Sequence, residues 1–268
     1  MPRFAANLSM LFADAPMLER FERAARAGFR AVEIQFPYEA PAAEVAAALR
    51  GAGLEMVLHN LPAGTWAAGE RGIACHPGRQ EEFRAGVRRA LQYADAMDVP
   101  RLNCLAGIAP KDMDAATLRR TFIENVRHAA AELKAAGRVL VIEPINRFDV
   151  PGFWLNRTDD AVSLLDEIGA DNAFVQYDLY HAQRTHGELC GTLSRYLERI
   201  GHLQIADNPG RHEPGTGEIA WDHVFAHIDR VGYAGWIGCE YIPATTTEAG
   251  LGWMQRYAPT PGASSVRA

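Results

Sequence analysis

Short apolar segments rich in β-branched residues alternate with longer amphipathic segments along the whole chain. A run of four to eight such residues, bounded by turn residues, is typical of a buried strand, and an apolar period of 3.6 is typical of a helix. Regular alternation of the two patterns is typical of parallel βαβ units. The segments that predict strands are 3–9, 31–36, 55–60, 99–107, 138–145, 173–178, 201–207 and 236–241.

The segments between these runs have the pattern of surface helices. In 17–28, the apolar residues Leu18 and Phe21 fall on one face, and the segment ends on a glycine that can terminate a helix. The same pattern recurs in 40–53 and, at greater length, in 117–137.

Eight strands that are each followed by a helix can close into a barrel. The 268 residues fit this architecture, for which about 250 residues are typical. An open, doubly wound sheet is the alternative, because a strand count taken from one sequence is easily wrong by one. We predict an α/β protein with a single-domain (β/α)₈ TIM barrel over residues 1–257. Residues 258–268 are small and polar, which predicts a flexible C-terminal tail.

Composition excludes several functional classes. A net charge of −6 disfavours nucleic acid as a partner, because phosphate binding needs a basic face. No apolar stretch approaches 18 residues, and the N-terminus lacks the apolar region of a signal peptide, so we expect no membrane association. The four scattered cysteines form no CxxC pair and are expected to be reduced thiols in a cytoplasmic protein. No GxGxxG, P-loop or GxSxG motif indicates nucleotide or serine-hydrolase chemistry.

Four predicted strands carry an oxygen-bearing side chain at their C-terminal ends, although strands buried on both faces should be almost continuously apolar. These residues are Glu143, Asp178, Gln204 and Glu240, at successive separations of 35, 26 and 36 residues, or about one βα unit each. Because the C-terminal ends of barrel strands surround the mouth where active sites form, we expect these four side chains to converge there.

Three converging carboxylates repel one another unless a cation lies between them. Oxygen ligands are preferred by hard divalent ions, which favours Mg²⁺ or Mn²⁺ over zinc held by thiolates. Each residue taken singly has another interpretation, as a helix cap, a salt-bridge partner or, for Gln204, an amide that bonds to loop backbone. Their recurrence at corresponding positions favours a metal site.

Three histidines lie near these strand ends. His181 follows Asp178 by three residues and can face the mouth from the start of the next helix, and His59 ends the third strand. Either could instead bond only to local backbone. His202 lies two residues before Gln204 and therefore points to the same side, deeper in the barrel, where a core role and a functional role are equally compatible with its position.

Two glycine-rich loops carry further candidates. Loop 206–221 contains Arg211, whose planar guanidinium suits a carboxylate, and long loops after barrel strands often carry function. Loop 60–79 could act as a lid, in which Trp66 excludes water and Arg71 meets an anion. The alternative for Arg71 is a solvated surface cation.

With these residues in place, the chain resembles the hydroxypyruvate isomerase family, within the xylose isomerase-like barrels that include the ketose 3-epimerases. The resemblance extends over almost the whole chain and excludes only the extreme tail. The segments that carry it are FAANLSMLF (4–12), HNLPAGTWAAGERGIACHPGR (59–79), IEPINRFDVPGF (142–153), QYDLYHAQR (176–184), GHLQIADNPGRHEPGTGEI (201–219) and CEYIPATTTEAGL (239–251).

This resemblance implies that Glu143, Asp178, Gln204 and Glu240 are metal ligands. It also implies that Glu143 and Glu240 exchange the substrate proton. The implied reaction converts hydroxypyruvate to 2-hydroxy-3-oxopropanoate (tartronate semialdehyde) through an enediolate, whose charge a metal can stabilise. In the related epimerases a histidine usually occupies the position of Gln204, so the site here would hold oxygen ligands throughout.

The substrate would be a small hydroxy-carbonyl acid, held at its carboxylate or hydroxyls by Arg211 together with His181 or His59, with Arg71 as a further anion-binding candidate. The alternatives are a 2-oxo-tetronate isomerase and a ketose 3-epimerase that use the same carboxylates. A metal-dependent phosphodiesterase should instead show clustered histidines and a basic face, and a non-catalytic binding barrel should bind no divalent ion. A homo-oligomer is compatible with the sequence.

Overall fold

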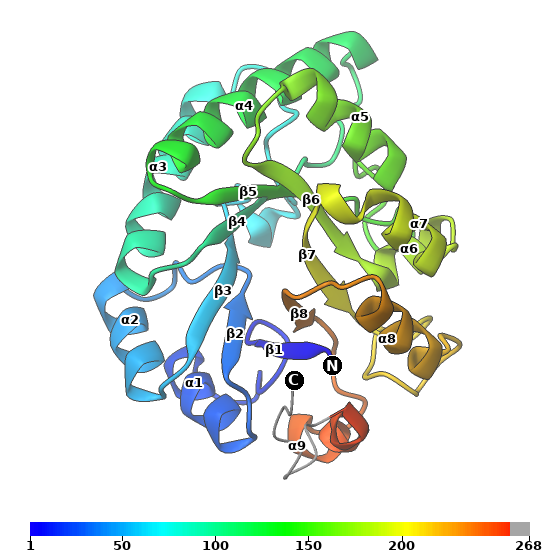
Figure 1. Cartoon of the computed structure of the whole chain (residues 1–268). Coiled ribbons are helices and arrows are strands. Elements are labelled where there is room, and N and C mark those ends of the chain that lie inside the picture. The colour runs from blue at the N-terminus through cyan, green and yellow to red at the C-terminus, as the bar shows by residue number, and fades with distance from the viewer. Residues whose placement is uncertain (258–268) are drawn as a thin grey trace, which may run out of the picture.

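The predicted barrel is present in the structure. The computed structural model describes residues 1–257, so the tail predicted for 258–268 lies outside the described residues. Eight parallel strands pair in chain order, and β1 pairs with β8 to close the barrel (Figure 1). The strands are β1 Arg3–Asn7, β2 Ala31–Ile34, β3 Glu55–Asn60, β4 Arg101–Cys104, β5 Val139–Ile142, β6 Ala173–Asp178, β7 Ile200–Ile205 and β8 Trp236–Cys239.

Helices form the outer layer and bury one apolar face each against the strands, as Phe21 and Ala24 do in α1. Figure 1 shows them around the barrel. None of the helices within residues 1–257 has the length and apolar character needed to cross a membrane. The helices are α1 Met17–Arg26, α2 Ala42–Gly51, α3 Gln80–Met97, α4 Ala115–Ala135, α5 Thr158–Ile168, α6 Leu179–Thr185, α7 Leu189–Tyr196, α8 Trp221–Arg230 and α9 Thr247–Gly250, with short 3₁₀ segments η1 Trp66–Ala68, η2 Leu197–Arg199 and η3 Leu251–Tyr257.

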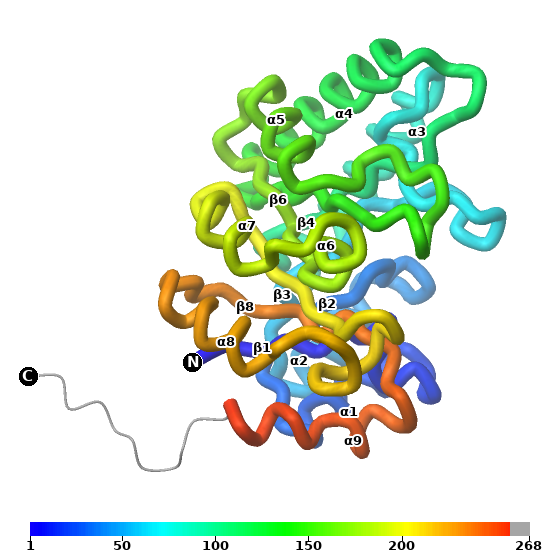
Figure 2. Tube along the Cα trace, turned by 90° about the vertical axis from the view of Figure 1, so that its right-hand side faces the viewer, coloured from blue at the N-terminus to red at the C-terminus, as the bar shows by residue number. Residues whose placement is uncertain are grey.

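The last described segment, α9 with η3, completes the outer layer after β8. The ring of Phe4 in β1 lies 4.9 Å from that of Trp253 in η3 and 5.3 Å from that of Phe225 in α8. Figures 1 and 2 both show this segment beside β1 and α1. Packing of this kind covers the outer face of the strand pair that closes the barrel.

The barrel interior changes character along the strands. A small apolar cluster that includes Ala5, Val57 and Val141, from β1, β3 and β5, fills part of it. Further along, the strands carry buried polar side chains at neighbouring positions: Asn7 pairs in register with Glu33, and Asp178 pairs with Gln204. The fold therefore places polar side chains inside the barrel on the way to its mouth.

Candidate active site

A cavity of about 220 Å³ lies at the C-terminal ends of the strands. Five of the predicted site residues line it: Arg71, Glu143, His181, Arg211 and Glu240. A sixth, Asp178, ends β6 and contacts His181 and Arg211 beneath the cavity. The structure thus brings six of the eight predicted residues to one place.

The three carboxylates converge as expected. Glu143 follows β5, Asp178 ends β6 and Glu240 follows β8, and all three are at most 4% exposed. Nε2 of His181 lies 3.8 Å from Glu143 Oε1 and 3.6 Å from Asp178 Oδ2. One carboxylate oxygen of Glu143, one of Asp178 and a ring nitrogen of His181 lie within 4.8 Å of one another, so the two carboxylates are close enough to share a metal ion.

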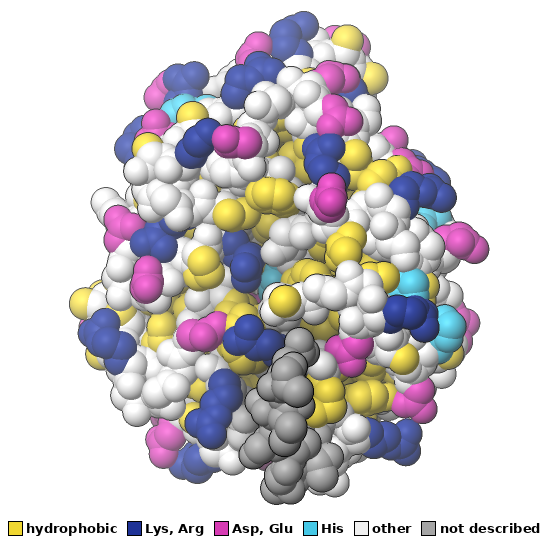
Figure 3. All heavy atoms as spheres, viewed as in Figure 1, with side chains coloured by type: hydrophobic (Ala, Val, Ile, Leu, Met, Phe, Trp, Pro, Cys, Tyr) yellow, Lys and Arg dark blue, Asp and Glu magenta, His cyan; other side chains and the backbone are white. Residues whose placement is uncertain are grey.

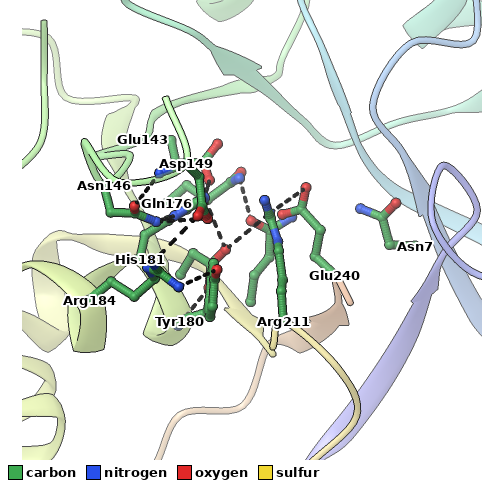
Figure 4. A network of polar contacts seen from close by, with 12 residues as sticks. Asn7, Glu143, Asn146, Asp149, Gln176, Tyr180, His181, Arg184, Arg211 and Glu240 are labelled. Atoms are coloured by element: carbon green, nitrogen blue, oxygen red, sulfur yellow. Dashed lines mark hydrogen bonds and ion pairs between the residues drawn. The ribbon is translucent and has the colours of Figure 1, made fainter. Parts of the chain in front are cut away.

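Arg211 lies between two of these carboxylates. Its Nη2 is 3.9 Å from Asp178 Oδ2 and 3.6 Å from Glu240 Oε1, and its guanidinium lies 5.1 Å from the centre of the Tyr180 ring. Figure 4 shows its side chain running between Tyr180 and Glu240. Arg211 also has a positive φ of 54°, a backbone conformation that non-glycine residues rarely adopt, which suits a residue held at a functional site.

One buried cation does not balance three buried carboxylates. Burial, together with Glu240 and Asp178, raises the pKa of Glu143 well above its usual range. Burial raises the pKa of Asp178 to about 6, even though Arg211 opposes the shift, and raises the pKa of Glu240 to about 8. Such shifts occur where negative charge is crowded and mark candidate functional groups.

Two carboxylate oxygens are left without partners. Within residues 1–257, Oδ2 of Asp178 and Oε2 of Glu240 are buried and accept no hydrogen bond. A buried carboxylate oxygen without a hydrogen bond is costly unless a metal or ligand binds it. The carboxylate donors at the site are oxygens, which a hard divalent cation prefers, so these residues fit such a cation.

His181 is oriented as a hydrogen-bond donor. The Oδ1 of Asn146 accepts from the backbone N–H groups of Phe148 and Asp149, so its Nδ2 faces His181 and donates to Nδ1 at 2.6 Å. Burial, with Arg211 and Arg184, lowers the pKa of His181 well below its usual value. The ring is therefore neutral with its proton on Nε2, directed at the carboxylates.

His59 and Gln204 do not line the cavity. Nδ1 of His59 lies 3.1 Å from the carbonyl oxygen of Asn60, and burial lowers its pKa to about 4. In Gln204, Nε2 donates to Glu33 and Oε1 accepts from Gln176. A carbonyl oxygen has two lone pairs, so Gln204 can still bind a cation, and its role as a ligand stays a prediction.

The loop after β3 presents Arg71 to the cavity. Its guanidinium stacks 3.9 Å from the centre of the Trp66 ring, and Nη1 donates to the carbonyl oxygens of Trp66 and Glu70. Among residues 1–257, no carboxylate forms an ion pair with Arg71. The cavity therefore contains a cation that is held in place but unneutralised.

Several residues at the site were not predicted from the sequence. Asn103 in β4 donates to Glu143 Oε2 at 2.8 Å, Gln35 after β2 donates to Glu240 Oε1, and Asn146 orients His181. Glu33 in β2 is fully buried and bonds to Gln204. Glu33 and Asn103 could have been found from the sequence by the same pattern as the four predicted metal ligands, because each is a polar residue within an apolar strand.

Comparison with known proteins places this geometry in a family. A model of the xylose isomerase-like TIM barrels matches residues 21–257. The chain is 54% identical to hydroxypyruvate isomerase of Escherichia coli strain K12, over 96% of this chain and all of that protein. It is 49% identical to 2-oxo-tetronate isomerase of Cupriavidus necator, over 96% of this chain and 99% of that protein.

A solved structure agrees with these matches. The crystal structure of a protein from Brucella melitensis described as AP endonuclease, family 2 superposes with a TM-score of 0.94 at 44% identity, covering 97% of this chain and all of that one. Both the fold and the sequence resemblance are thereby confirmed. The chain therefore belongs to the hydroxypyruvate isomerase family of xylose isomerase-like TIM barrels.

Proposed function

We propose that this protein is a divalent metal-dependent isomerase that interconverts hydroxypyruvate and 2-hydroxy-3-oxopropanoate. The observation that carries the proposal is one small cavity that joins two buried carboxylates, Glu143 and Glu240, with two cationic side chains, Arg71 and Arg211. Carboxylates suit proton transfer at carbon, and arginines suit an acid substrate. The names of the relatives support the same substrate class.

The residues proposed to hold Mg²⁺ or Mn²⁺ are Glu143, Asp178, Gln204 and Glu240. When bound, the cation supplies positive charge that stabilises negative charge on the substrate oxygens. The unpartnered oxygens of Asp178 and Glu240 support this assignment.

Isomerisation requires a proton to leave the hydroxymethyl carbon and a proton to reach the neighbouring carbon, while the hydroxyl proton passes from the hydroxymethyl oxygen to the oxygen of the former keto group. One of Glu143 and Glu240 removes the first, and the other delivers the second. Asn103 holds Oε2 of Glu143, and Gln35 holds Oε1 of Glu240. Because an amide fixes one oxygen of each carboxylate, the other oxygen is in a defined place, and in Glu240 it accepts no hydrogen bond from residues 1–257.

The remaining residues hold the substrate. Arg71 and Arg211 bind the carboxylate, since their planar guanidinium groups match it geometrically. His181 donates its Nε2 proton to a substrate oxygen, a role that its hydrogen bond from Asn146 to Nδ1 supports. Trp66 lines the cavity next to Arg71 and limits the entry of water. His59 does not line the cavity, but its neighbour Asn60 does. We therefore keep His59 in the proposal only as a residue that can affect substrate binding through Asn60.

The test uses protein stripped of metal and then restored with Mg²⁺ or Mn²⁺. Hydroxypyruvate is incubated in D₂O, and NMR follows deuterium entering the substrate and the appearance of product. We expect exchange and isomerisation only in the restored samples. Equal exchange in the stripped and restored samples would contradict the metal-dependent mechanism, and no product in either would contradict the function.

A 2-oxo-tetronate isomerase is the second candidate, favoured by the 49% identity to the Cupriavidus necator relative. The same NMR assay with 2-oxo-tetronates and free ketoses separates the three substrate classes. A neutral ketose leaves Arg71 without an anion, which is why the ketose 3-epimerase reaction ranks last.

We also propose that the enzyme acts in the cytoplasm without nucleic acid. All four cysteines are free, and three are buried, which suits a reducing compartment. Figure 3 shows Lys and Arg mixed with Asp and Glu over the face in view, as opposed to a basic field. A homo-oligomer remains part of the proposal and is tested by light scattering. The boundary between a barrel at 1–257 and a tail is tested by truncation after residue 257.

A further inference from the structure

A fourth buried carboxylate lies in the barrel interior, outside the catalytic cavity. Glu33 in β2 is fully buried, and it does not line the cavity. It accepts hydrogen bonds from Asn7 Nδ2 at 2.8 Å, His202 Nε2 at 2.6 Å and Gln204 Nε2 at 2.7 Å. Three donors from β1 and β7 therefore converge on one side chain of β2.

The direction of the hydrogen bonds to Glu33 is fixed by a contact that Asn7 makes with the backbone. The Oδ1 of Asn7 accepts from the backbone N–H of Ser9, so Asn7 must present its amide nitrogen to Oε1 of Glu33. That oxygen is consequently an acceptor. Gln204, which bonds to the same oxygen, must also present its nitrogen.

This contact decides where the carbonyl oxygen of Gln204 lies. With its nitrogen bound by Glu33, the amide turns Oε1 away, where it accepts from Gln176 at 2.6 Å. Gly238, the register partner of Gln204, leaves room for this arrangement because it has no side chain. A Cβ at this position would collide with the carboxylate of Glu33. A free glutamine amide has no such preference between its two ends.

We propose that Glu33 is a positioning residue that keeps the Gln204 carbonyl oxygen, and not its NH₂ group, available to the catalytic cation. The inference rests on the proposed function, in which Gln204 is a ligand. Residues that orient ligands contribute strongly to metal affinity even though they never touch the metal. The competing explanation is that Glu33 merely adds negative charge near the site.

Two substitutions of Glu33 separate these explanations. Glu33→Gln removes the charge but keeps a carbonyl acceptor for Asn7 and Gln204, while its NH₂ group can donate to Nε2 of His202. The ring of His202 can accept by moving its proton to Nδ1, which has no partner within residues 1–257. Glu33→Asp keeps the charge but withdraws the carboxylate from Gln204 by one methylene.

The readout is Mn²⁺ affinity of the metal-free protein, measured by titration calorimetry. We expect Glu33→Asp to weaken binding by roughly 10-fold to 100-fold, as removal of a ligand-orienting contact does, and Glu33→Gln to stay close to wild type. The reverse order would show that charge matters and would overturn the inference. Equal affinity of all three proteins would overturn it as well.

A double-mutant cycle tests whether Glu33 acts through Gln204. In a Gln204→Met background, Glu33→Asp should change Mn²⁺ affinity by no more than about 2-fold, which is within the usual error of additivity, because the amide that Glu33 orients is absent. A full additional loss would contradict the inference. Asn125→Leu is the control for destabilisation. Asn125 is buried and donates to the carbonyl oxygen of Ala74, and neither residue is a proposed metal ligand or neighbours one in sequence.

The outcomes keep this inference apart from the proposed function. A wild-type protein that binds no divalent cation would overturn both. Binding by wild type with unchanged binding by Glu33→Asp overturns only the role of Glu33. If Glu33→Asp fails to fold, the Mn²⁺ affinity of Glu33→Gln still tests the inference. A loss of Mn²⁺ affinity in Glu33→Gln would contradict a positioning role for Glu33.

Discussion

Glu143 and Glu240 differ in what surrounds the carboxylate oxygen that is not held by an amide. In Glu143 it faces Nε2 of His181 at 3.8 Å, whereas in Glu240 it has no partner within residues 1–257. A base needs an oxygen that is free of strong donors, and a proton donor benefits from a raised pKa. Oε2 of Glu240 is therefore the carboxylate oxygen that is open to a cation or to the substrate, which makes Glu240 the first residue to test by substitution.

Replacing Glu240 with glutamine should separate chemistry from folding. We expect Glu240→Gln to lower kcat on hydroxypyruvate by about 100-fold to 10,000-fold, the usual contribution of a general acid or base. Far-ultraviolet circular dichroism should be unchanged, because the substitution keeps the volume. The control is Glu132→Gln on the exposed face of α4, which makes the same charge change. Activity of Glu240→Gln within a few fold of wild type contradicts the assignment.

Arg71 should determine preference for acids. Because a hydrogen bond to a charged group contributes about 1.5 to 3 kcal/mol, Arg71→Met should raise KM for hydroxypyruvate roughly 10-fold to 100-fold. Binding of neutral dihydroxyacetone, measured by competition, should hardly change. Arg79→Met is the matched control in the same loop, since Arg79 already pairs with Glu70 and Glu82. An equal loss for the acid and the neutral compound would show that Arg71 has only a structural role.

Strand-end residues were predictable and their partners were not. Glu143, Asp178 and Glu240 stand out because a charge ends an apolar run, a signal contained within one segment. The position of His59 has the same signal, yet its ring turns to the backbone of Asn60. Rotamers and amide orientations, such as that of Asn146 against His181, depend on contacts 35 residues apart and are set by packing.

At the scale of elements, the loop after β3 is held by backbone contacts as well as side chains. The N–H of Gly72 donates to the carbonyl oxygen of Ala63, and Gly72 forms an isolated antiparallel bridge with Ala106. Its φ is 109°, and a Cβ there would collide with the backbone of Leu105. This glycine anchors the segment that carries Trp66 and Arg71 to the loop after β4.

Gly72→Ala should therefore disturb the site from a distance. We expect a loss of more than about 1 kcal/mol in unfolding free energy, since both the positive φ and the close contact oppose a side chain. Trypsin cleavage within 61–79 should accelerate, and KM should rise. Gly69→Ala is the matched control, with a φ of 91° but no atom within 4 Å of an added Cβ. Equal effects of the two substitutions would contradict anchoring by the Leu105 contact.

Element order could be predicted from the sequence, but element ends could not. All eight predicted strands are present, although the observed β4 covers only Arg101–Cys104 of the predicted 99–107. The helix predicted at 117–137 begins earlier, because the side chain of Asp114 accepts from the N–H of Thr117 and caps it. Hydrophobic periodicity records which face is buried, whereas ends depend on single polar contacts.

For the molecule as a whole, the carboxylates link stability to pH. In the cation-free folded protein the pKa of Asp178 is about 6 and that of Glu240 about 8, against ordinary values of 3.8 and 4.5. As pH rises between these values, the unfolded chain releases protons that the folded chain retains. The contribution of these two carboxyl groups to the free energy of unfolding therefore falls with rising pH across this window.

Thermal unfolding in EDTA should show this fall. We expect Tm to decrease from pH 7 to pH 8, above the range in which the lowered pKa values of His59 and His181 act in the opposite direction, by about 2 to 4 °C for each kcal/mol lost in a protein of this size. Mn²⁺ at pH 8 should restore it, because ligand binding stabilises the folded state. Glu240→Gln should flatten the decrease, whereas Glu132→Gln should not. A Tm that rises toward pH 8 in EDTA would contradict the raised pKa values.

Closure of the barrel has a consequence for synthesis. Arg3 in the first strand pairs with Trp236 in the last, so the sheet keeps two unpaired edges until the last strand has been synthesised. At 5 to 20 residues per second, a ribosome needs roughly 10 to 50 s to make that partner. During this interval the growing sheet exposes unpaired edges that other chains can join. Yield in a heterologous host should therefore depend on chaperone supply and growth temperature more than on the stability of the finished enzyme.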